Sequence, residues 1–156
     1  MSGAENLQIV KATPVRKRKY WYPPYDSSSD FVMPWWLETY VNEPPAEDHW
    51  VTILLRDQEV ARCKYIVTGA RVDPVLGNLP HGQLDILAFE VAVPMRRMGI
   101  GQKAMQKIRD QNPLLRMTAL NDGAESRKFW DGIGWIRHEA AHPALRGGER
   151  VTYSEP

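Results

Sequence analysis

The feature that most constrains this sequence is an apolar run that ends in a glycine-containing turn and is followed at once by an amphipathic segment. The run closes at Val93, the turn carries Gly99 and Gly101, and the segment QKAMQKIRDQN has helical periodicity up to Pro113. A buried strand, a turn and a helix in this order point several backbone N–H groups and the positive end of the helix dipole at one place. Such a place suits an anion, above all a phosphate, and glycine lets the backbone approach the ligand closely.

Composition indicates one ordinary globular domain. The chain has 156 residues, of which 43% are hydrophobic and 25% charged, and its net charge is +1. A chain of this length buries a core without cross-links, and so small a charge gives no general attraction to nucleic acid or to an anionic membrane. The single cysteine, Cys63, excludes an internal disulfide, and no apolar run is long enough to span a bilayer. We therefore expect a soluble, cytoplasmic protein without a signal peptide, whose partners include neither membrane nor nucleic acid.

The N-terminal part, residues 1–48, combines basic and aromatic residues. Leu7–Ala12 is either a short strand or a loose arm, and the basic run Arg16–Lys19 leads directly into the aromatic stretch Tyr20–Tyr25. Cations beside aromatic rings suit an RNA strand or an acidic partner. A run this short in a nearly neutral chain favours a solvated edge, with the rings folded onto the domain.

Aromatic residues continue in Phe31–Val41, which we interpret as a short helix or two turns with Pro34 in the first turn. Trp35 and Trp36 are adjacent, and adjacent side chains on one helix cannot both face the core. Core packing accounts for one of the two tryptophans. The other tryptophan then contributes to an exposed aromatic patch, which would shape an acceptor pocket or bind a protein partner.

From Trp50 onward the pattern is that of a mixed α/β fold. Two β-branched segments, Trp50–Arg56 and Val60–Gly69, flank a turn at Asp57–Glu59 and predict a hairpin with Cys63 in its core. After them we expect a loop, an apolar strand that leads into the glycine turn and helix, a parallel strand, a short helix and two closing strands: Asp73–Gly82, Leu84–Val93, Leu114–Asn121, Ala124–Ile133, Gly134–Ala140 and Arg150–Pro156. This order predicts a mixed sheet with a ligand site at the carboxyl end of a central strand.

The carboxylates of the central strand are its informative residues. Leu84–Val93 is apolar almost throughout, as expected of a strand covered on both faces, yet it contains Asp85 and Glu90. Each carboxylate must lie at an exposed end, be paired, or have a raised pKa. Because the two are five positions apart, they face opposite sides of the strand, and we expect at most one to reach an acceptor.

Two motifs give this chain a resemblance to the GNAT superfamily of acyl-CoA-dependent N-acyltransferases. The signature Q/R-x-x-G-x-G/A is filled by Arg96, Gly99 and Gly101. A later family pattern, N-x-x-A-x-x-x-Y-x-x-x-G-F, resembles GAESRKFWDGIGW, with Ser126 at the alanine and Trp130 at the tyrosine. The resemblance covers Trp50–Trp135 and implies a mixed, partly antiparallel twisted sheet flanked by helices. The whole chain, 1–156, is then a single domain with a variable part at 1–48, a cofactor-binding core at 49–136 and closing strands at 137–156.

The resemblance implies acetyl-CoA as co-substrate. In relatives the pyrophosphate lies on the amides after the arginine, and the pantetheine arm runs along the end of the central strand. Carried over, the cofactor-binding residues are Val91, Val93, Arg96, Arg97, Met98, Gly99, Ile100, Gly101 and Trp130. Transfer to an amine acceptor, either a small amine or a protein lysine or N-terminus, would be direct and assisted by a base.

The departures from the family pattern concern catalysis. Trp130 replaces the tyrosine that often serves as general acid, and an indole cannot release a proton at useful pH. Ser126 or Tyr153 are the candidate replacements. For the base the candidates are Asp85, which aligns with the glutamate of some histone-acetylating relatives, and Glu90.

An alternative hypothesis keeps the GNAT scaffold without efficient transfer. In that case the protein binds CoA, or a protein partner through its tryptophan-rich N-terminal surface, and Trp130 is the feature that favours it. The histidines, His49, His81, His138 and His142, show no metal-ligand spacing, so we expect no metal. Arg127 and Lys128 are expected on a solvated helix face.

Overall fold

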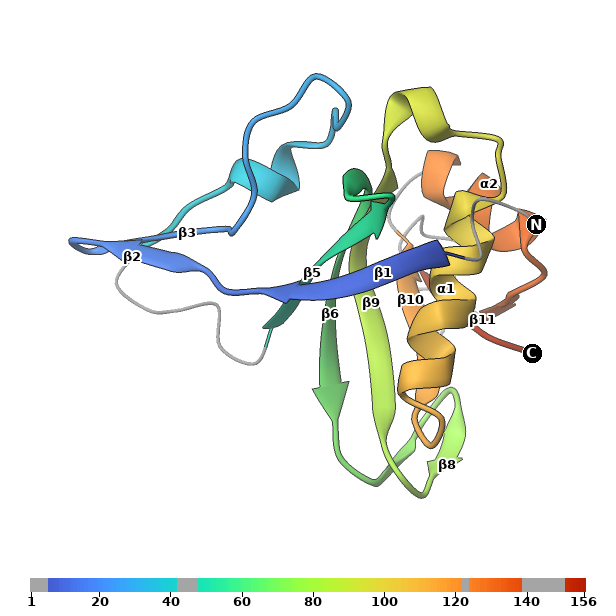
Figure 1. Cartoon of the computed structure of the whole chain (residues 1–156). Coiled ribbons are helices and arrows are strands. Elements are labelled where there is room, and N and C mark those ends of the chain that lie inside the picture. The colour runs from blue at the N-terminus through green and yellow to red at the C-terminus, as the bar shows by residue number, and fades with distance from the viewer. Residues whose placement is uncertain (1–5, 42–47, 122–123, 139–150) are drawn as a thin grey trace. The chain divides into compact units, whose positions relative to one another are not determined.

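A computed structural model describes residues 6–41, 48–121, 124–138 and 151–156 (Figure 1). Within these residues the main sheet has seven strands in the order β1-β5-β6-β9-β10-β12-β11. Its strands are β1 (Leu7–Ala12), β5 (Asp48–Leu55), β6 (Gln58–Thr68), β9 (Gln83–Val91), β10 (Arg116–Asn121), β11 (Ile136–His138) and β12 (Val151–Ser154). The helices are the α-helices α1 (Ile100–Gln111) and α2 (Ala124–Gly132) and the single 3-10 turns η2 (Pro34–Leu37) and η3 (Val93–Met95). None of the described helices is both long and apolar enough to cross a membrane.

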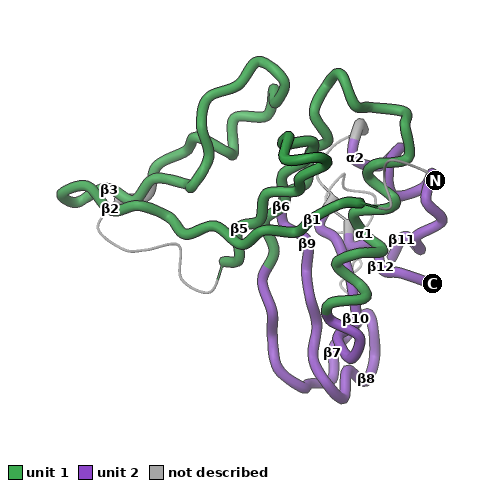
Figure 2. Tube along the Cα trace, viewed as in Figure 1, with its two compact units in different colours: residues 1–65, 88–111 green, residues 66–87, 112–156 purple. Residues whose placement is uncertain are grey.

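The chain divides into two compact units, coloured separately in Figure 2. Unit 1 consists of residues 1–65 and 88–111, and unit 2 of residues 66–87 and 112–156. The divisions fall inside β6 and β9, so each of these strands contributes residues to both units.

In unit 1, β1 pairs antiparallel with β5 from Leu7–Leu55 to Ala12–Trp50, which confirms the strand rather than the loose arm. α1 packs on β1. β5 and β6 are joined by a turn at Arg56 and Asp57, whose φ angles are 51° and 64°. Positive φ at both central residues belongs to the tight hairpin turn that matches strand twist, so the turn comes one residue earlier than predicted.

A small second sheet follows β1 and contains the basic run. It consists of β2 (Val15–Lys17), β3 (Tyr20–Tyr22) and β4 (Tyr40–Val41). The charged groups of Arg16, Lys17 and Lys19 lie 5.9, 5.8 and 5.5 Å from the ring centroids of Trp21, Tyr22 and Tyr20, respectively. The aromatic rings of this hairpin are thus covered by its own cations.

One buried cluster of unit 1, rich in aromatic residues, packs the N-terminal segment against the sheet. Its buried members are Tyr25, Phe31, Trp36, Trp50, Ala88 and Ala92. Trp36 is 1% exposed, and the half-buried Trp35 packs against the cluster. Core packing is therefore confirmed for Trp36, and Trp35 is only partly exposed, because η2 is a single turn that brings both rings to the cluster. The exposed apolar side chains of this segment are instead Val32 and Leu37.

In unit 2, β9 and β10 pair in parallel from Gln83–Arg116 to Ile86–Ala119, as a strand–helix–strand connection requires. β10 pairs antiparallel with β12, and β12 with β11, which confirms the closing strands within the described residues. The helix predicted at Ala124–Ile133 is α2 and ends one residue earlier.

Two features of this part differ from the prediction. The expected loop Asp73–Gly82 contains the hairpin of β7 (Arg71–Asp73) and β8 (Gly77–Leu79), because the Asp73 carboxylate accepts the N–H groups of Val75 and Leu76 and stabilises a tight turn. β9 alternates between buried and half-buried residues and is not covered equally on both faces. Its buried face carries Leu84, Ile86, Ala88 and Glu90.

Candidate functional site

The predicted strand, turn and helix are all present in unit 1. β9 ends at Val91, η3 follows, and α1 begins at Ile100. The first helical bond runs from the Lys103 N–H to the Gly99 carbonyl at 3.1 Å. Gly101 therefore lies in the first turn of the helix, whereas the sequence pattern suggested a helix from Gln102.

The backbone of the turn presents N–H groups at the start of α1. Arg97 and Gly99 have φ angles of 64° and 77°, in the left-handed region. The first N–H groups of α1 have no acceptor inside the helix, and the helix dipole adds positive potential there. No acidic residue occupies the first turn, and Arg97, Met98 and Gly99 are exposed. This geometry suits a phosphate or pyrophosphate.

The two backbone positions predicted for the pantetheine arm already have protein partners. The Val93 N–H donates to the Asp30 carbonyl at 2.9 Å. The Val91 carbonyl accepts from Nε of Arg96 at 3.0 Å. A ligand that bonds to these groups replaces the two contacts.

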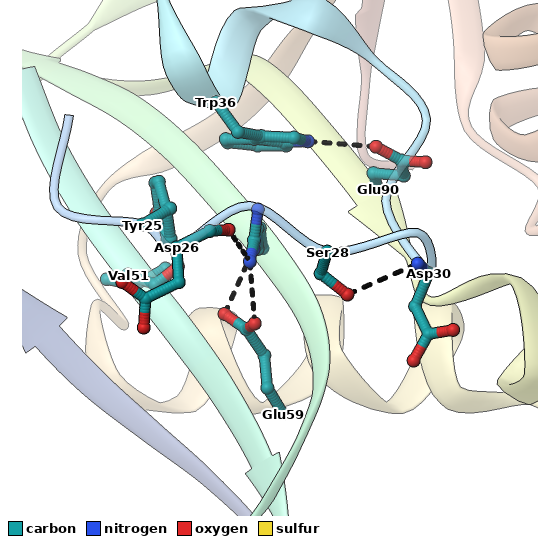
Figure 3. Close-up of polar contacts among 9 residues, drawn as sticks. Tyr25, Asp26, Ser28, Asp30, Trp36, Val51, Glu59 and Glu90 are labelled. Carbon is teal, nitrogen blue, oxygen red and sulfur yellow. Dashed lines mark hydrogen bonds and ion pairs between the residues drawn. The ribbon is translucent and has the colours of Figure 1, made fainter.

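Glu90 is buried at the end of β9 and accepts four hydrogen bonds. Its donors are the N–H groups of Val32 and Met33 at 2.8 and 3.1 Å, the Trp36 indole at 2.8 Å and the Arg96 guanidinium at 2.9 Å. Figure 3 shows the indole of Trp36 directed at the carboxylate. Every donor belongs to unit 1, and of these residues only Arg96 was predicted from the sequence as part of the site.

Asp85, the second base candidate, lies in unit 2 within a chain of polar side chains. The Thr118 hydroxyl donates to Asp85 at 2.8 Å and accepts from the Gln83 amide at 2.7 Å, and Gln83 in turn accepts from Arg71. Burial raises the pKa of Asp85, while the Thr118 hydrogen bond and the charge of Arg71 oppose the rise. Thr118 lies on the strand opposite Asp85, so its role depends on strand register and was not visible in the sequence.

The remaining catalytic candidates lie on α2 and β12 of unit 2. Ser126 is half-buried. The Tyr153 hydroxyl donates to Asp131 at 2.9 Å, and burial together with this bond raises the pKa of Tyr153. A phenol that holds its proton more tightly is a weaker acid. Arg127 forms an exposed ion pair with Asp131 at 3.8 Å, which agrees with the predicted solvated helix face.

Trp130, at the position of the family tyrosine, is 3% exposed. Its ring lies 4.7 Å from that of Phe129 and 4.6 Å from that of Trp135. The Trp135 N–H also donates to the Trp130 carbonyl at 3.0 Å. Trp130 thus belongs to an aromatic cluster that closes the end of α2.

Within the described parts of the chain, no three histidine, cysteine or acidic side chains gather as a metal site. The His49 ring stacks on that of Tyr65 at 4.9 Å, and His138 bonds to Ser154 at 2.7 Å. His142 lies outside the described residues. Cys63 is fully buried, as predicted.

Comparison with known proteins gives a fold. No protein-family model matches the sequence, and no curated protein matches it. An acetyltransferase of Thermus thermophilus matches with a TM-score of 0.53 and 13% identity over 72% of this chain and 66% of its own. The N-acetyltransferase YlbP of Bacillus subtilis, solved in complex with coenzyme A, matches with a TM-score of 0.51 and 16% identity over 69% of this chain and 70% of its own. A protein of Desulfovibrio desulfuricans assigned to the GNAT family of acetyltransferases matches with a TM-score of 0.50 and 19% identity over 69% of this chain and 67% of its own.

The chain has the GNAT fold. The predicted GNAT-like mixed sheet flanked by helices is thereby confirmed. This chain spans slightly under two thirds, 66%, of the Thermus acetyltransferase. At identities of 13% to 19% the likeness to these acetyltransferases concerns the fold and does not extend to the activity.

Proposed function

We propose that this protein is an N-acyltransferase that moves an acetyl or other acyl group from acyl-CoA to an amine. The observation that carries the proposal is the turn from Arg96 to Gly101, where the positive φ angles of Arg97 and Gly99 lead into the N-terminus of α1 on a GNAT fold. The coenzyme A in the Bacillus subtilis structure, which has the same fold, supports acyl-CoA as the donor.

In this proposal the pyrophosphate binds the amides of Arg97 to Gly101. Gly99 has no side chain to block the approach, and the Arg97 side chain is exposed beside it. The Arg96 guanidinium is held by Glu90 and the Val91 carbonyl, so the field at the phosphates comes from amides, the helix dipole and Arg97. The pantetheine arm forms hydrogen bonds with the backbone at Val91 and Val93. It does so once the hydrogen bond from the Val93 N–H to the Asp30 carbonyl has broken. Trp130, which the family pattern predicts as a cofactor-binding residue, is also proposed as a cofactor contact.

The chemistry is a direct transfer. A neutral amine attacks the thioester carbonyl, the C–N bond forms, and the C–S bond breaks as the tetrahedral intermediate collapses. The amine proton passes to a base, and the leaving thiolate takes a proton from water, for which the Ser126 hydroxyl is the candidate relay. Asp85 is the candidate base to be tested, because burial raises its pKa, whereas four donors already occupy Glu90.

A second function follows from Trp130. Because an indole cannot donate a proton in catalysis, the protein in this alternative holds CoA without efficient transfer. The tryptophan-rich surface gives this alternative less support than the sequence suggested, since Trp36 is in the core.

One experiment separates the two functions. Acetyl-CoA is titrated calorimetrically into the purified protein, and free CoA thiol is then assayed with and without a panel of small amines and lysine peptides. Binding with amine-dependent thiol release supports the transferase. Binding without release across the panel favours the scaffold that holds CoA. The absence of binding contradicts the transferase and leaves the form of the alternative that binds a protein partner without CoA.

A further inference from the structure

We propose that Glu90 is a positioning residue and not the base: it ties the segment Asp30–Leu37 to the cofactor turn through Arg96, so that acyl-CoA binding at the turn and the order of this segment are coupled. The inference rests on the proposed acyl transfer. It also goes beyond it, because it gives the N-terminal segment a part in the reaction.

The location of Glu90 is costly for a carboxylate. It is 5% exposed and shares its face of β9 with Ala88, a member of the aromatic cluster that contains Trp36 and Trp50. Moving a carboxylate out of water is unfavourable unless hydrogen bonds and an opposite charge compensate. An apolar side chain would fill the same place without this cost, so the carboxylate has to be explained by what it connects.

What it connects is one segment and one turn that are far apart in sequence. Oε2 accepts from the Val32 N–H and the Arg96 guanidinium, while Oε1 accepts from the Met33 N–H and the Trp36 indole. The segment and the turn are also linked by a hydrogen bond from the Val93 N–H to the Asp30 carbonyl. Asp30 and Val93 are close in sequence to the residues that bond to Glu90. Each carboxylate oxygen of Glu90 thus already accepts two hydrogen bonds, which argues against a role as base.

The other end of the segment is fixed independently. Arg62, 2% exposed, donates to the Asp26 carbonyl at 2.9 Å and to both oxygens of Glu59. Its guanidinium lies 4.0 Å from the Phe31 ring centroid. Tyr25 donates to the Val51 carbonyl at 2.7 Å. Arg62 and Tyr25 therefore hold the chain on the sheet just before the segment, while the hydrogen bonds of Glu90 connect the segment to the turn.

This geometry places the segment on the acceptor side. If the pantetheine runs along Val91 and Val93, its thioester end lies near the strand end to which Asp30 is bonded. Val32 and Leu37, 62% and 51% exposed, are then available to the incoming amine. A change in the conformation of the turn on cofactor binding is transmitted to these side chains through the hydrogen bonds of Arg96 and Glu90.

The test compares Glu90→Gln with a matched control, Glu59→Gln. Both changes remove one carboxylate that anchors the same segment, but only Glu90 contacts the turn. Hydrogen–deuterium exchange over residues 30–37 is measured with and without CoA, together with the acceptor KM, kcat and the pH profile of kcat. In the wild type CoA changes the exchange rate of the segment, because the pantetheine replaces the hydrogen bond between Asp30 and Val93. In Glu90→Gln the amides of Val32 and Met33 exchange faster, the CoA effect is lost, and kcat/KM for the acceptor falls about tenfold or more.

Two results overturn the proposal. If Glu90→Gln removes the acidic limb of the pH profile, Glu90 is the base. If the CoA effect on exchange survives in Glu90→Gln, or is lost equally in Glu59→Gln, the coupling does not pass through Glu90. Should Glu90→Gln fail to fold, Arg96→Met cuts the same link while leaving Glu90 with its three neutral donors. Exchange is then measured at a CoA concentration that calorimetry shows to saturate this variant, and the CoA effect on exchange is expected to be lost. A wild type that does not bind CoA removes the proposed function and the coupling with it, whereas binding without coupling removes only the inference.

Discussion

Arg97 and Gly99 both adopt left-handed backbone conformations, with φ angles of 64° and 77°, and only Met98 separates them. This pair turns the chain from η3 into α1. A Cβ built on Gly99 meets no atom within 4 Å beyond its chain neighbours, so a substitution there encounters backbone strain and not a clash. The turn can therefore be disturbed without disturbing the packing.

Gly99→Ala should lower the free energy of unfolding by about 1 kcal/mol, because an L-residue is strained at this φ. It should also weaken CoA binding about tenfold, since the turn amides shift relative to the pyrophosphate. Gly77→Ala is the matched control: its φ is 82°, it also has open space, and it is the first residue of β8, directly after the β7–β8 turn. Urea unfolding should give similar losses for both variants, and calorimetry should show weaker CoA binding only for Gly99→Ala. Equal affinities would exclude this turn as the phosphate site.

Gly82→Ala should be far more destabilising than Gly77→Ala. A Cβ at Gly82 would lie 2.1 Å from the Thr68 carbonyl oxygen, and φ is 102°. The Gly82 carbonyl also accepts the Arg116 N–H at 3.1 Å, so the glycine cannot move away without disturbing β10. We expect a loss of about 3 kcal/mol or more in urea unfolding. A loss no greater than that of Gly77→Ala would mean that Thr68 and Gly82 are not in contact.

Asp85→Asn should change how stability depends on pH. Burial raises the pKa of Asp85, so the folded protein binds this proton more tightly than the unfolded chain does. The resulting stabilisation is fully present below the unfolded pKa of about 4 and is lost as the pH rises through the folded pKa. Asparagine retains an acceptor for Thr118 but does not titrate, so the variant should gain stability relative to the wild type as the pH rises above about 4. Urea unfolding across this range measures the difference, with Asp110→Asn on the exposed side of α1 as the control for loss of one negative charge. If the stability of Asp85→Asn relative to the wild type fell as the pH rose, the raised pKa of Asp85 would be contradicted.

Cys63 should not react with a thiol reagent in the native protein. It is fully buried, and burial raises the pKa of its thiol, so thiolate is scarce and the sulfur is not accessible. Ellman's reagent should react with one thiol per chain in guanidinium chloride and with almost none in buffer over the same time. Rapid reaction in buffer would show that β6 opens readily.

Part of the fold could be predicted because its causes are local. The apolar run of β9, the glycines of the turn and the periodicity of α1 lie within a few residues of one another. The hairpin of β5 and β6 and the parallel pairing of β10 follow from propensity and from the intervening helix. The β7–β8 hairpin was missed because its turn depends on a side chain, Asp73, that bonds to the backbone.

The candidate site was predicted less completely. The sequence singled out Asp85 and Glu90 as carboxylates on an apolar strand, and it could not distinguish them. The partners of Glu90 include Val32 and Trp36, 58 and 54 residues away in the chain, and those of Asp85 include Thr118, 33 residues away. Contacts between residues so far apart in sequence produce no local sequence pattern, so they could not be predicted from the sequence.

By itself the sequence determined the GNAT-like order of elements and the position of the glycine turn before α1, because hydrophobic period and glycine stereochemistry act over a few residues. Only the tertiary structure decided which carboxylate is enclosed by donors and which keeps a raised pKa. That outcome depends on burial and on hydrogen-bond donors that distant segments bring to each side chain, and folding assembles these together.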